Sequence, residues 1–396
     1  MTNQEQHKLA CELSALGVFR GVLHSPAMTA FVDFLGIDGG VEPLKKAARY
    51  GDFVYALADD NYCFSDFLCR TVYSDENRYI VSAARGEEIP ACLAENAKKE
   101  LALFTRLTKL DCDALCACLG TDGYLPRFEN RATDFVKTYA DRLANVGKYG
   151  YGIFASATMF RVSGEEILPV KSADAISLDD FVGYEDERRR VLENTEALCE
   201  GRPAANVLLC GDAGTGKSST VKACANALSN RGVRLIELRK DQLFSLSHIM
   251  GRIADNPLKF ILFIDDLSFN KNDDCFSMLK AALEGSASAK ANNAVIYATS
   301  NRRHIVKESF SDREGSDDVH HSDTVQELMS LSDRFGLTVY FEKPNKALYL
   351  EIIHRLAEKN GVRMEQKELD VKAEAFALGR GSRSPRAAEQ FINSLM

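Results

Sequence analysis

The sequence predicts an α/β protein with a mostly helical first half, and three observations lead to this fold class. Before about residue 150, apolar residues recur mainly at the spacing of amphipathic helices. After residue 176, short apolar runs alternate with helical segments, which is typical of a parallel sheet covered by helices. From Pro344 to the C-terminus the spacing is helical again. We therefore expect a helical domain at residues 1–170, an α/β core at 176–342 and a helical C-terminal part at 343–396.

The first of these parts shows its helical pattern most clearly in AKKELALFTRLTKL, where Leu101, Phe104 and Leu107 fall on one face. Two short extended pieces follow, at residues 158–162 and 167–170, and predict a strand pair. The small polar stretch KSADAIS comes next. We place the domain boundary near residues 165–176, with the strand pair in the first domain.

The core is predicted from apolar runs that are too short for helices. Continuous apolarity without alternation is what a strand buried on both faces requires. We expect a five-stranded parallel sheet made of residues 206–210, 233–238, 260–264, 294–298 and 337–341.

Composition limits the classes of function. The net charge of −8 provides no overall basic field for nucleic acid or an anionic membrane. Residues 1–23 lack the pattern of a secretory signal, and no apolar run approaches the roughly 20 residues that cross a bilayer. Eleven cysteines in such a chain favour a reducing, cytoplasmic location. A metal site at Cys112, Cys116 and Cys118 would need a fourth ligand that the local sequence lacks, so we favour small buried helix residues.

Residues 211–218 carry the strongest motif, GDAGTGKS, which fits G-x-x-x-x-G-K-[ST]. Its glycines let the backbone N–H groups turn inward onto phosphate oxygens. Lys217 adds a positive charge toward the β and γ phosphates, and the Ser218 hydroxyl can ligate Mg²⁺. An apolar strand precedes the motif and an amphipathic helix follows it. The segment therefore predicts a nucleotide site for ATP or GTP.

An acidic pair follows the third apolar run, in FILFIDDL. Ligands of open α/β sheets bind beyond the carboxyl ends of the strands, so we expect Asp265 and Asp266 near the phosphate loop. Asp265 is the candidate ligand of Mg²⁺, directly or through water. Asp266 is the candidate that orients or deprotonates an attacking water. The alternative is a pair of capping residues at a turn.

Four further segments stand in a fixed order around these motifs: SLDDFVGYEDERRRVL, ATSN, LSDRFGL and GSRSPRAAEQF. With them, residues 176–396 are similar to AAA+ P-loop ATPases. They resemble in particular a bacterial AAA+ family that is classified only as a domain of unknown function. The resemblance implies ATP and Mg²⁺ as cofactors, and it implies that residues 343–396 form a helical lid.

The same resemblance assigns roles to single residues. The backbone near Val182 and Gly183 would hold adenine, and Asn301 would hold the attacking water or the γ-phosphate. Arg334 would reach the site of the next subunit as an arginine finger. Arg386, with Arg383 as the second choice, would contact the nucleotide from the lid. The complete set expected to bind nucleotide is Val182, Gly183, Gly211, Asp212, Ala213, Gly214, Thr215, Gly216, Lys217, Ser218, Ser219 and Arg386; the catalytic set is Lys217, Asp266, Asn301 and Arg334; the metal set is Ser218 and Asp265.

Two positions depart from the family pattern. AAA+ proteins usually carry Glu after the metal-binding Asp, whereas Asp266 is one methylene shorter. Arg239 stands where relatives often keep a small polar residue, and its pairing with Asp266 is left open by the sequence.

The resulting expectation is an ATPase that works as a homo-oligomer and moves an unknown protein client held by the helical N-terminal half. One alternative is a switch that binds ATP without turning it over. Another is a DNA-associated loader or remodeller, suggested by the basic clusters at residues 188–190 and 301–304. The polar segment 307–323, with His320 and His321, is expected to be a mobile loop near a subunit interface, and a metal role for the His pair lacks local support.

Overall fold

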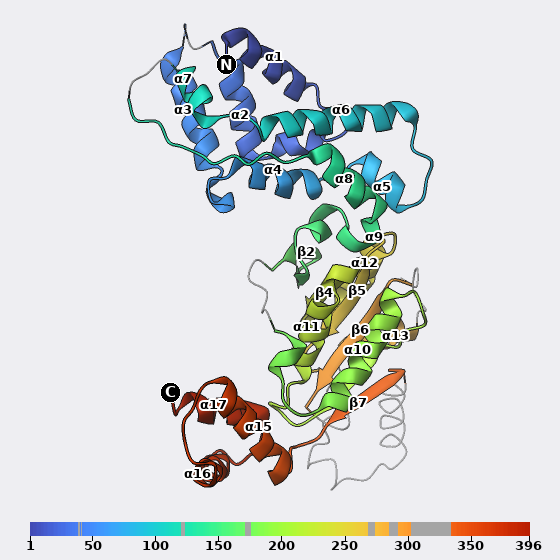
Figure 1. Cartoon of the computed structure of the whole chain (residues 1–396). Coiled ribbons are helices and arrows are strands. Elements are labelled where there is room, and N and C mark those ends of the chain that lie inside the picture. Colours follow the sequence, from blue (N-terminus) through green and yellow to red (C-terminus); the bar gives the residue numbers. More distant parts are fainter. Residues whose placement is uncertain are drawn as a thin grey trace. The chain divides into compact units, whose positions relative to one another are not determined.

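The computed structural model describes the chain except residues 39, 41, 120–122, 171–175, 268–273, 285–291 and 302–333. The described residues form two compact units, Met1–Ser156 and Ala157–Met396 (Figure 1). Among the described helices, none combines the length and the apolar character needed to cross a membrane.

The first unit is built of helices, in agreement with the spacing of its apolar residues. They are α1 (Asn3–Ser14), α2 (Pro26–Gly36), α3 (Pro43–Tyr55), α4 (Phe64–Tyr73), α5 (Arg78–Ala84), α6 (Ala91–Leu107), α7 (Cys112–Ala117), α8 (Phe135–Ala144) and α9 (Val146–Tyr149).

Local capping and an aromatic interior explain this helical unit. At the start of α1, the Thr2 side chain accepts a hydrogen bond from the Glu5 backbone, and the Glu5 carboxylate accepts one from the Thr2 backbone. This reciprocal pair satisfies two backbone donors that a helix start leaves open. Inside, the ring centroid of Phe31 lies 4.8 Å from that of Phe53 and 5.0 Å from that of Phe64. Such buried aromatic pairs contribute large apolar areas to a core.

Cys112 and Cys116 of α7 pack against Tyr50. The sulfur atoms of Cys112 and Cys116 lie 3.5 and 3.2 Å from the Tyr50 hydroxyl. In the described parts of the chain, no group of three or more His, Cys, Asp or Glu side chains is arranged to hold a metal ion. Cys112 is a buried helix residue as expected, whereas Cys116 and Cys118 are half-buried and Cys118 follows the end of α7.

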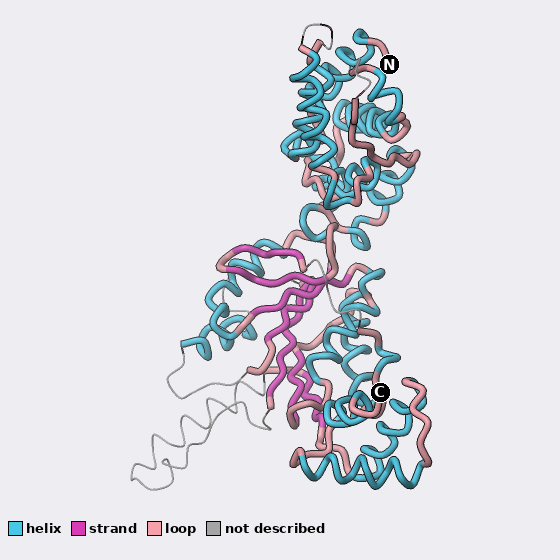
Figure 2. The backbone as a smooth tube through the Cα atoms, turned by 90° about the vertical axis from the view of Figure 1, so that its left-hand side faces the viewer, coloured by secondary structure: helices cyan, strands magenta, loops and turns pink. Residues whose placement is uncertain are grey.

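The second unit combines a sheet with helices. Its strands are β1 (Met159–Ser163), β2 (Glu166–Pro169), β3 (Val207–Gly211), β4 (Val233–Leu238), β5 (Lys259–Ile264), β6 (Ala294–Ser300) and β7 (Leu337–Phe341). Its helices are α10 (Glu185–Cys199), α11 (Lys217–Ala227), α12 (Leu246–Ile253), α13 (Asp274–Glu284), α15 (Lys346–Lys359), α16 (Gln366–Gly379) and α17 (Pro385–Asn393). Figure 2 shows the strands as one layer with helices on either side.

The sheet has seven strands in the order β2-β1-β4-β5-β6-β3-β7, so the expected count of five is wrong. The five expected strands pair in parallel, and the additional two come from the predicted strand pair. β1 pairs with β2 antiparallel and with β4 in parallel, for example Phe160 with Ile236. The sequence could not reveal this because a pairing between distant segments leaves no local pattern. By covering the edge of β4, the pair satisfies backbone groups that an open edge would expose.

Because β1 and β2 belong to the sheet, the two compact units divide at another place than the sequence suggested. The expected first domain ended at residue 170 and included the strand pair, whereas the structure divides the chain between Ser156 and Ala157. The division of the second unit into a core at 176–342 and a lid at 343–396 stays a prediction.

One face of the sheet packs on α10 and α11. Val191 of α10 and Val221 and Cys224 of α11 are buried against strand residues such as Leu209 and Phe263. This packing fixes the start of α11 directly beyond the carboxyl end of β3, where the phosphate-loop motif lies.

Candidate functional site

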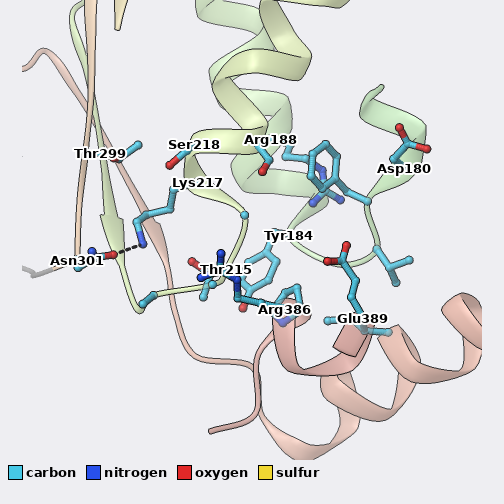
Figure 3. A pocket seen from close by; sticks show the side chains of 18 of the residues that line it. Asp180, Tyr184, Arg188, Thr215, Lys217, Ser218, Thr299, Asn301, Arg386 and Glu389 are labelled. Carbon is cyan, nitrogen blue, oxygen red and sulfur yellow. Dashed lines mark hydrogen bonds between the residues drawn. The ribbon is translucent and has the colours of Figure 1, made fainter. Parts of the chain in front are cut away.

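The expected site residues meet at the carboxyl edge of the sheet. β3 pairs with β6 up to Cys210 and Ser300, and β5 pairs with β6 up to Ile264 and Ala298. The ends of three neighbouring parallel strands therefore lie together, as in other open α/β sheets. A pocket of about 530 Å³ opens at this edge and also receives side chains from α15 and α17 (Figure 3).

Most of the predicted nucleotide residues line this pocket. These are Val182, Ala213, Gly214, Thr215, Gly216, Lys217, Ser218, Ser219 and Arg386, together with Asp265, Asp266 and Asn301. Gly211 and Asp212 instead line a smaller adjoining pocket of about 100 Å³, which Asn301 shares. Gly183 and Arg334 are in neither lining.

The end of β3, where the phosphate loop begins, requires glycine. Gly211 has φ of +142°, and a Cβ added there would lie 2.0 Å from the carbonyl oxygen of Phe341 on the neighbouring strand. Gly216, at φ +88°, precedes the first residue of α11. Glycine adopts such positive φ values without the steric cost that other residues incur. The motif's glycines are thus explained by the backbone path of the loop.

Lys217 lies buried beneath this loop, with 5% of its surface exposed. Its Nζ donates hydrogen bonds to the carbonyl oxygens of Gly211 (2.9 Å) and Asp212 (2.7 Å). It also donates to Oδ1 of Asn301 at 3.1 Å, the bond drawn in Figure 3. Burial lowers the pKa of Lys217, since a charged ammonium loses hydration there. Neutral acceptors offset that loss only in part, so an anion at the loop would stabilise the charged form further.

Asp265 gathers three donors on one carboxylate oxygen. Its Oδ1 accepts from the hydroxyls of Ser218 (2.6 Å) and Thr299 (2.5 Å) and from the backbone N–H of Asp266 (3.1 Å). A hydroxyl and a carboxylate side by side are oxygen ligands of the kind that Mg²⁺ prefers, with water completing its shell. The chemistry of Ser218 and Asp265 therefore fits the expected metal position.

Asp266 is held in an uncommon backbone conformation. Its φ is +52°, in the left-handed region that Asp and Asn adopt more readily than other residues with a Cβ. Its backbone N–H donates to the Thr299 hydroxyl at 2.9 Å, and its Oδ1 accepts from Nδ2 of Asn301 at 2.7 Å. The sequence left open whether Arg239 pairs with Asp266. In the structure the Arg239 guanidinium instead makes two 3.1 Å hydrogen bonds to Asp241.

The segment before α10 forms another wall of the pocket. Gly183 has φ of +74°, and a Cβ there would lie 2.7 Å from Cδ1 of Leu348 on α15. The Tyr184 hydroxyl donates to the Glu342 carbonyl oxygen at 2.6 Å. Asp180 accepts from Lys359 of α15 at 2.7 Å. These contacts tie the segment to the C-terminal helices within the second unit.

The start of α17 reaches the phosphate loop itself. The Ser384 side chain caps the helix, and the backbone N–H of Arg386 donates to the Gly214 carbonyl oxygen at 3.3 Å. Arg383, the second choice for a lid arginine, makes hydrogen bonds of 2.9 and 2.8 Å to Glu374 and does not line the pocket. Of the two arginines that the sequence offered for contact with the nucleotide, only Arg386 therefore lines the pocket.

Sequence reasoning missed several residues that line the pocket. Thr299 precedes the conspicuous Asn301 and supplies a hydroxyl to Asp265. Arg188 was grouped with a basic cluster, yet it is buried at 8% exposure, with its guanidinium carbon 5.3 Å from the Phe181 ring centroid. Glu389 lies three residues after Arg386, one helical turn, and this spacing was the available signal.

Some expectations lie partly or wholly outside the described residues. Arg334 is described and half-buried just before β7, but the residues before it in its motif, 331–333, are not. The segment 307–323 with its His pair and the basic residues 302–304 are also outside the described ranges.

Comparison with known proteins gives the chain a family. The model of a family described as "Protein of unknown function (DUF815)" matches residues 155–396. The chain belongs to this family. The match confirms the expected membership of a family whose function is unknown. All the site residues discussed above lie in the matched region. No curated protein matches the chain.

Solved structures give a more distant likeness. The RuvB Holliday junction branch migration motor of Thermotoga maritima matches with 17% identity and a TM-score of 0.37. A substituted variant of that RuvB matches with 18% identity and a TM-score of 0.36. Both matches cover 55% of this chain, which spans only 63% of either RuvB chain. Function is therefore argued from the geometry of the site.

Proposed function

We propose that this chain is an AAA+ ATPase that binds ATP with Mg²⁺ at the loop between β3 and α11 and hydrolyses it in a homo-oligomer. One observation carries the proposal: Lys217, Asp265, Asp266 and Asn301 are joined through hydrogen bonds at the mouth of a single pocket. Phosphate binding, metal binding and water activation each need one part of this arrangement.

The phosphate-binding role belongs to the loop and Lys217. The carbonyl oxygens of Gly211 and Asp212 hold the ammonium group in place. When ATP binds, its phosphate oxygens offer this buried cation stronger partners than neutral carbonyls do. The dipole of α11 adds positive potential at the same point.

The metal-binding role falls to Ser218 and Asp265, whose oxygens lie 2.6 Å apart. Mg²⁺, when bound, supplies positive charge that neutralises the β and γ phosphates. Thr299 keeps Asp265 oriented through its own hydrogen bond.

The role of activating water falls to Asp266, with Asn301 as its positioning partner. The carboxylate of Asp266 accepts the proton of the attacking water, and the Asn301 amide holds that carboxylate at 2.7 Å. Catalysis of this kind consists of positioning and charge stabilisation.

Completion of the site by a second subunit is part of the proposal. Arg334 is not among the residues that line the pocket of its own chain, which suits a role in trans. A guanidinium stays charged and presents a planar fork of donors to the developing charge of the phosphoryl group. Hydrolysis would then depend on assembly, and the helical first unit would hold the client.

The test is the ATPase rate per chain as a function of protein concentration. We expect the rate per chain to rise with concentration as oligomers form, and the mass measured by light scattering to rise with ATP. Lys217→Ala is the control and should abolish nucleotide binding. If the native chain binds no ATP, or if Lys217→Ala hydrolyses it normally, the proposal is wrong.

A second candidate is a switch that binds ATP but does not turn it over. The observation that favours it is Asp266, which is shorter than the usual Glu and already bonded to Asn301. Tight ATP binding with no phosphate release at any protein concentration would establish the switch in place of the enzyme.

The DNA-associated alternative has little support in the described residues. Arg188 is buried, Arg189 pairs with Asp186 at 2.6 Å, and Arg190 donates to the Thr338 carbonyl oxygen at 3.3 Å. Binding to single- and double-stranded DNA measured across salt concentrations tests it, because phosphate contacts produce a steep salt dependence.

A further inference from the structure

An acidic side chain lines the proposed nucleotide pocket without a hydrogen-bond or ion-pair partner among the described residues. Glu389 of α17 faces the pocket beside Arg386 (Figure 3). It is exposed, and among the described residues it makes no hydrogen bond or ion pair, not even with Arg386 one turn before it. A carboxylate in a pocket built for a polyanion needs an explanation, because like charges repel at close range.

The position of Glu389 along the pocket follows from how α17 is anchored. The backbone N–H of Arg386 donates to the Gly214 carbonyl oxygen at 3.3 Å, and a Cβ on Gly214 would lie 3.1 Å from Cβ of Arg386. The first turn of α17 therefore rests on the phosphate loop. Glu389 stands three residues further, about 4.5 Å along the helix axis.

The same pocket also has apolar lining residues that could receive a base. Val182, Ile352 and Leu356 line the pocket, the last two from α15, which packs against α17. An aromatic base fits such walls, as ligands generally bury their apolar parts against apolar side chains. Because Glu389 stands one helical turn past the contact of α17 with the phosphate loop, the group that it would meet is the one next to the phosphates, which is the ribose.

The chemistry of a nucleoside triphosphate leaves few partners for this group. An ionised carboxylate only accepts hydrogen bonds, and the phosphates offer no donors. The donors of ATP are the two ribose hydroxyls and the amino group of adenine. We propose that Glu389 accepts hydrogen bonds from the ribose hydroxyls, so that the site selects ribonucleotides over deoxyribonucleotides. An acidic residue performs the same task in dinucleotide-binding folds.

This inference depends on the proposed function, and it predicts an unusual pattern of affinities. With ATP, the hydroxyls offset the repulsion between Glu389 and the phosphates. With 2′-deoxy-ATP, the repulsion stays and a hydrogen bond is lost. We expect the native chain to bind ATP about 10- to 100-fold more tightly than 2′-deoxy-ATP, the range for hydrogen bonds to charged groups.

The experiment is calorimetric titration of the full chain with Mg²⁺ and each of four nucleotides: ATP, 2′-deoxy-ATP, 3′-deoxy-ATP and inosine triphosphate. Glu389→Ala should weaken ATP binding and strengthen 2′-deoxy-ATP binding, so that the two affinities converge. Damage to the fold would weaken both. Gln390→Ala, at the next exposed position of α17, is the matched control and should keep the native preference.

The outcomes separate this inference from the function on which it depends. If the native chain binds ATP and both deoxy forms equally, the ribose assignment is overturned while ATP binding stands, and this result needs no variant. If Glu389→Ala instead removes a preference for ATP over inosine triphosphate, the carboxylate contacts the base and the assignment is also overturned. If no nucleotide binds the native chain, the proposed function fails.

Discussion

Replacing Asp266 by asparagine is the sharpest test of the proposed chemistry, because we expect little effect on folding and a large loss of turnover. Asp266 has φ of +52°, and Asn is the residue that shares its tolerance for this conformation. The amide oxygen introduced at position 266 can still accept from Nδ2 of Asn301. We therefore expect Asp266→Asn to change the free energy of unfolding by less than about 0.5 kcal/mol, the usual range for substitutions that keep local interactions.

Turnover should fall much further than stability. An amide cannot accept the proton of an attacking water, and loss of a positioned general base typically costs about 10²- to 10⁴-fold. ATP affinity should be unchanged or higher, since a negative charge near the phosphates is removed. Phosphate release at saturating ATP, ATP titration and urea unfolding measure the three quantities separately.

The matched variant Asp266→Ala separates the backbone from the carboxylate. Alanine removes the base as asparagine does, but it adds a cost of about 1–2 kcal/mol for the left-handed conformation. The two variants should be equally inactive, with Asp266→Ala less stable. If Asp266→Asn turns over ATP at the native rate, another residue manages the water and the proposed role is refuted.

The remaining predictions concern the subunit interface and the loop. Mixing inactive Arg334→Ala protein with inactive Lys217→Ala protein should restore part of the ATPase rate, because some interfaces then combine an intact loop with an intact arginine; no recovery at any ratio would contradict a shared site. Gly211→Ala should destabilise the second unit by about 2 kcal/mol or more, since it adds a clash with the Phe341 carbonyl oxygen to the cost of positive φ. Gly201→Ala, at φ +69° with open space around it, should lose only the conformational cost of about 1–2 kcal/mol in the same urea titration, and equal losses would contradict the clash.

The strands of the core could be predicted because the signal is local. Residues 233–238 and 337–341 were expected as strands, and β4 and β7 have those bounds. A strand buried on both faces must be apolar throughout, so its own sequence reveals it. The addition of β1 beside β4 could not be predicted in this way, because it depends on the meeting of two segments that are distant in the chain.

The residues of the site also divide into those that local sequence reveals and those that depend on contacts between distant segments. Lys217 and Ser218 belong to one continuous motif, and Asp265 and Asp266 end a strand that the sequence marks clearly. Thr299 has no such mark, since its role arises only when β6 lies beside β5 and its hydroxyl reaches Asp265. Glu389 is similar, because only the packing of α17 on the phosphate loop turns it toward the pocket.

The three consecutive arginines at 188–190 suggest a basic surface for nucleic acid, but the geometry of the helix spreads their side chains over different faces. Successive residues of an α-helix point about 100° apart, so three consecutive side chains cannot share a face. Arg188 turns inward over Phe181, Arg189 turns outward to Asp186, and Arg190 reaches the backbone of β7. Arg188 is buried, so its charge is withdrawn from the surface, whereas Arg189 and Arg190 are exposed and Arg189 pairs with Asp186. A basic run within a helix is therefore not a continuous basic strip, and in this chain one of its members, Arg188, lines the proposed nucleotide pocket.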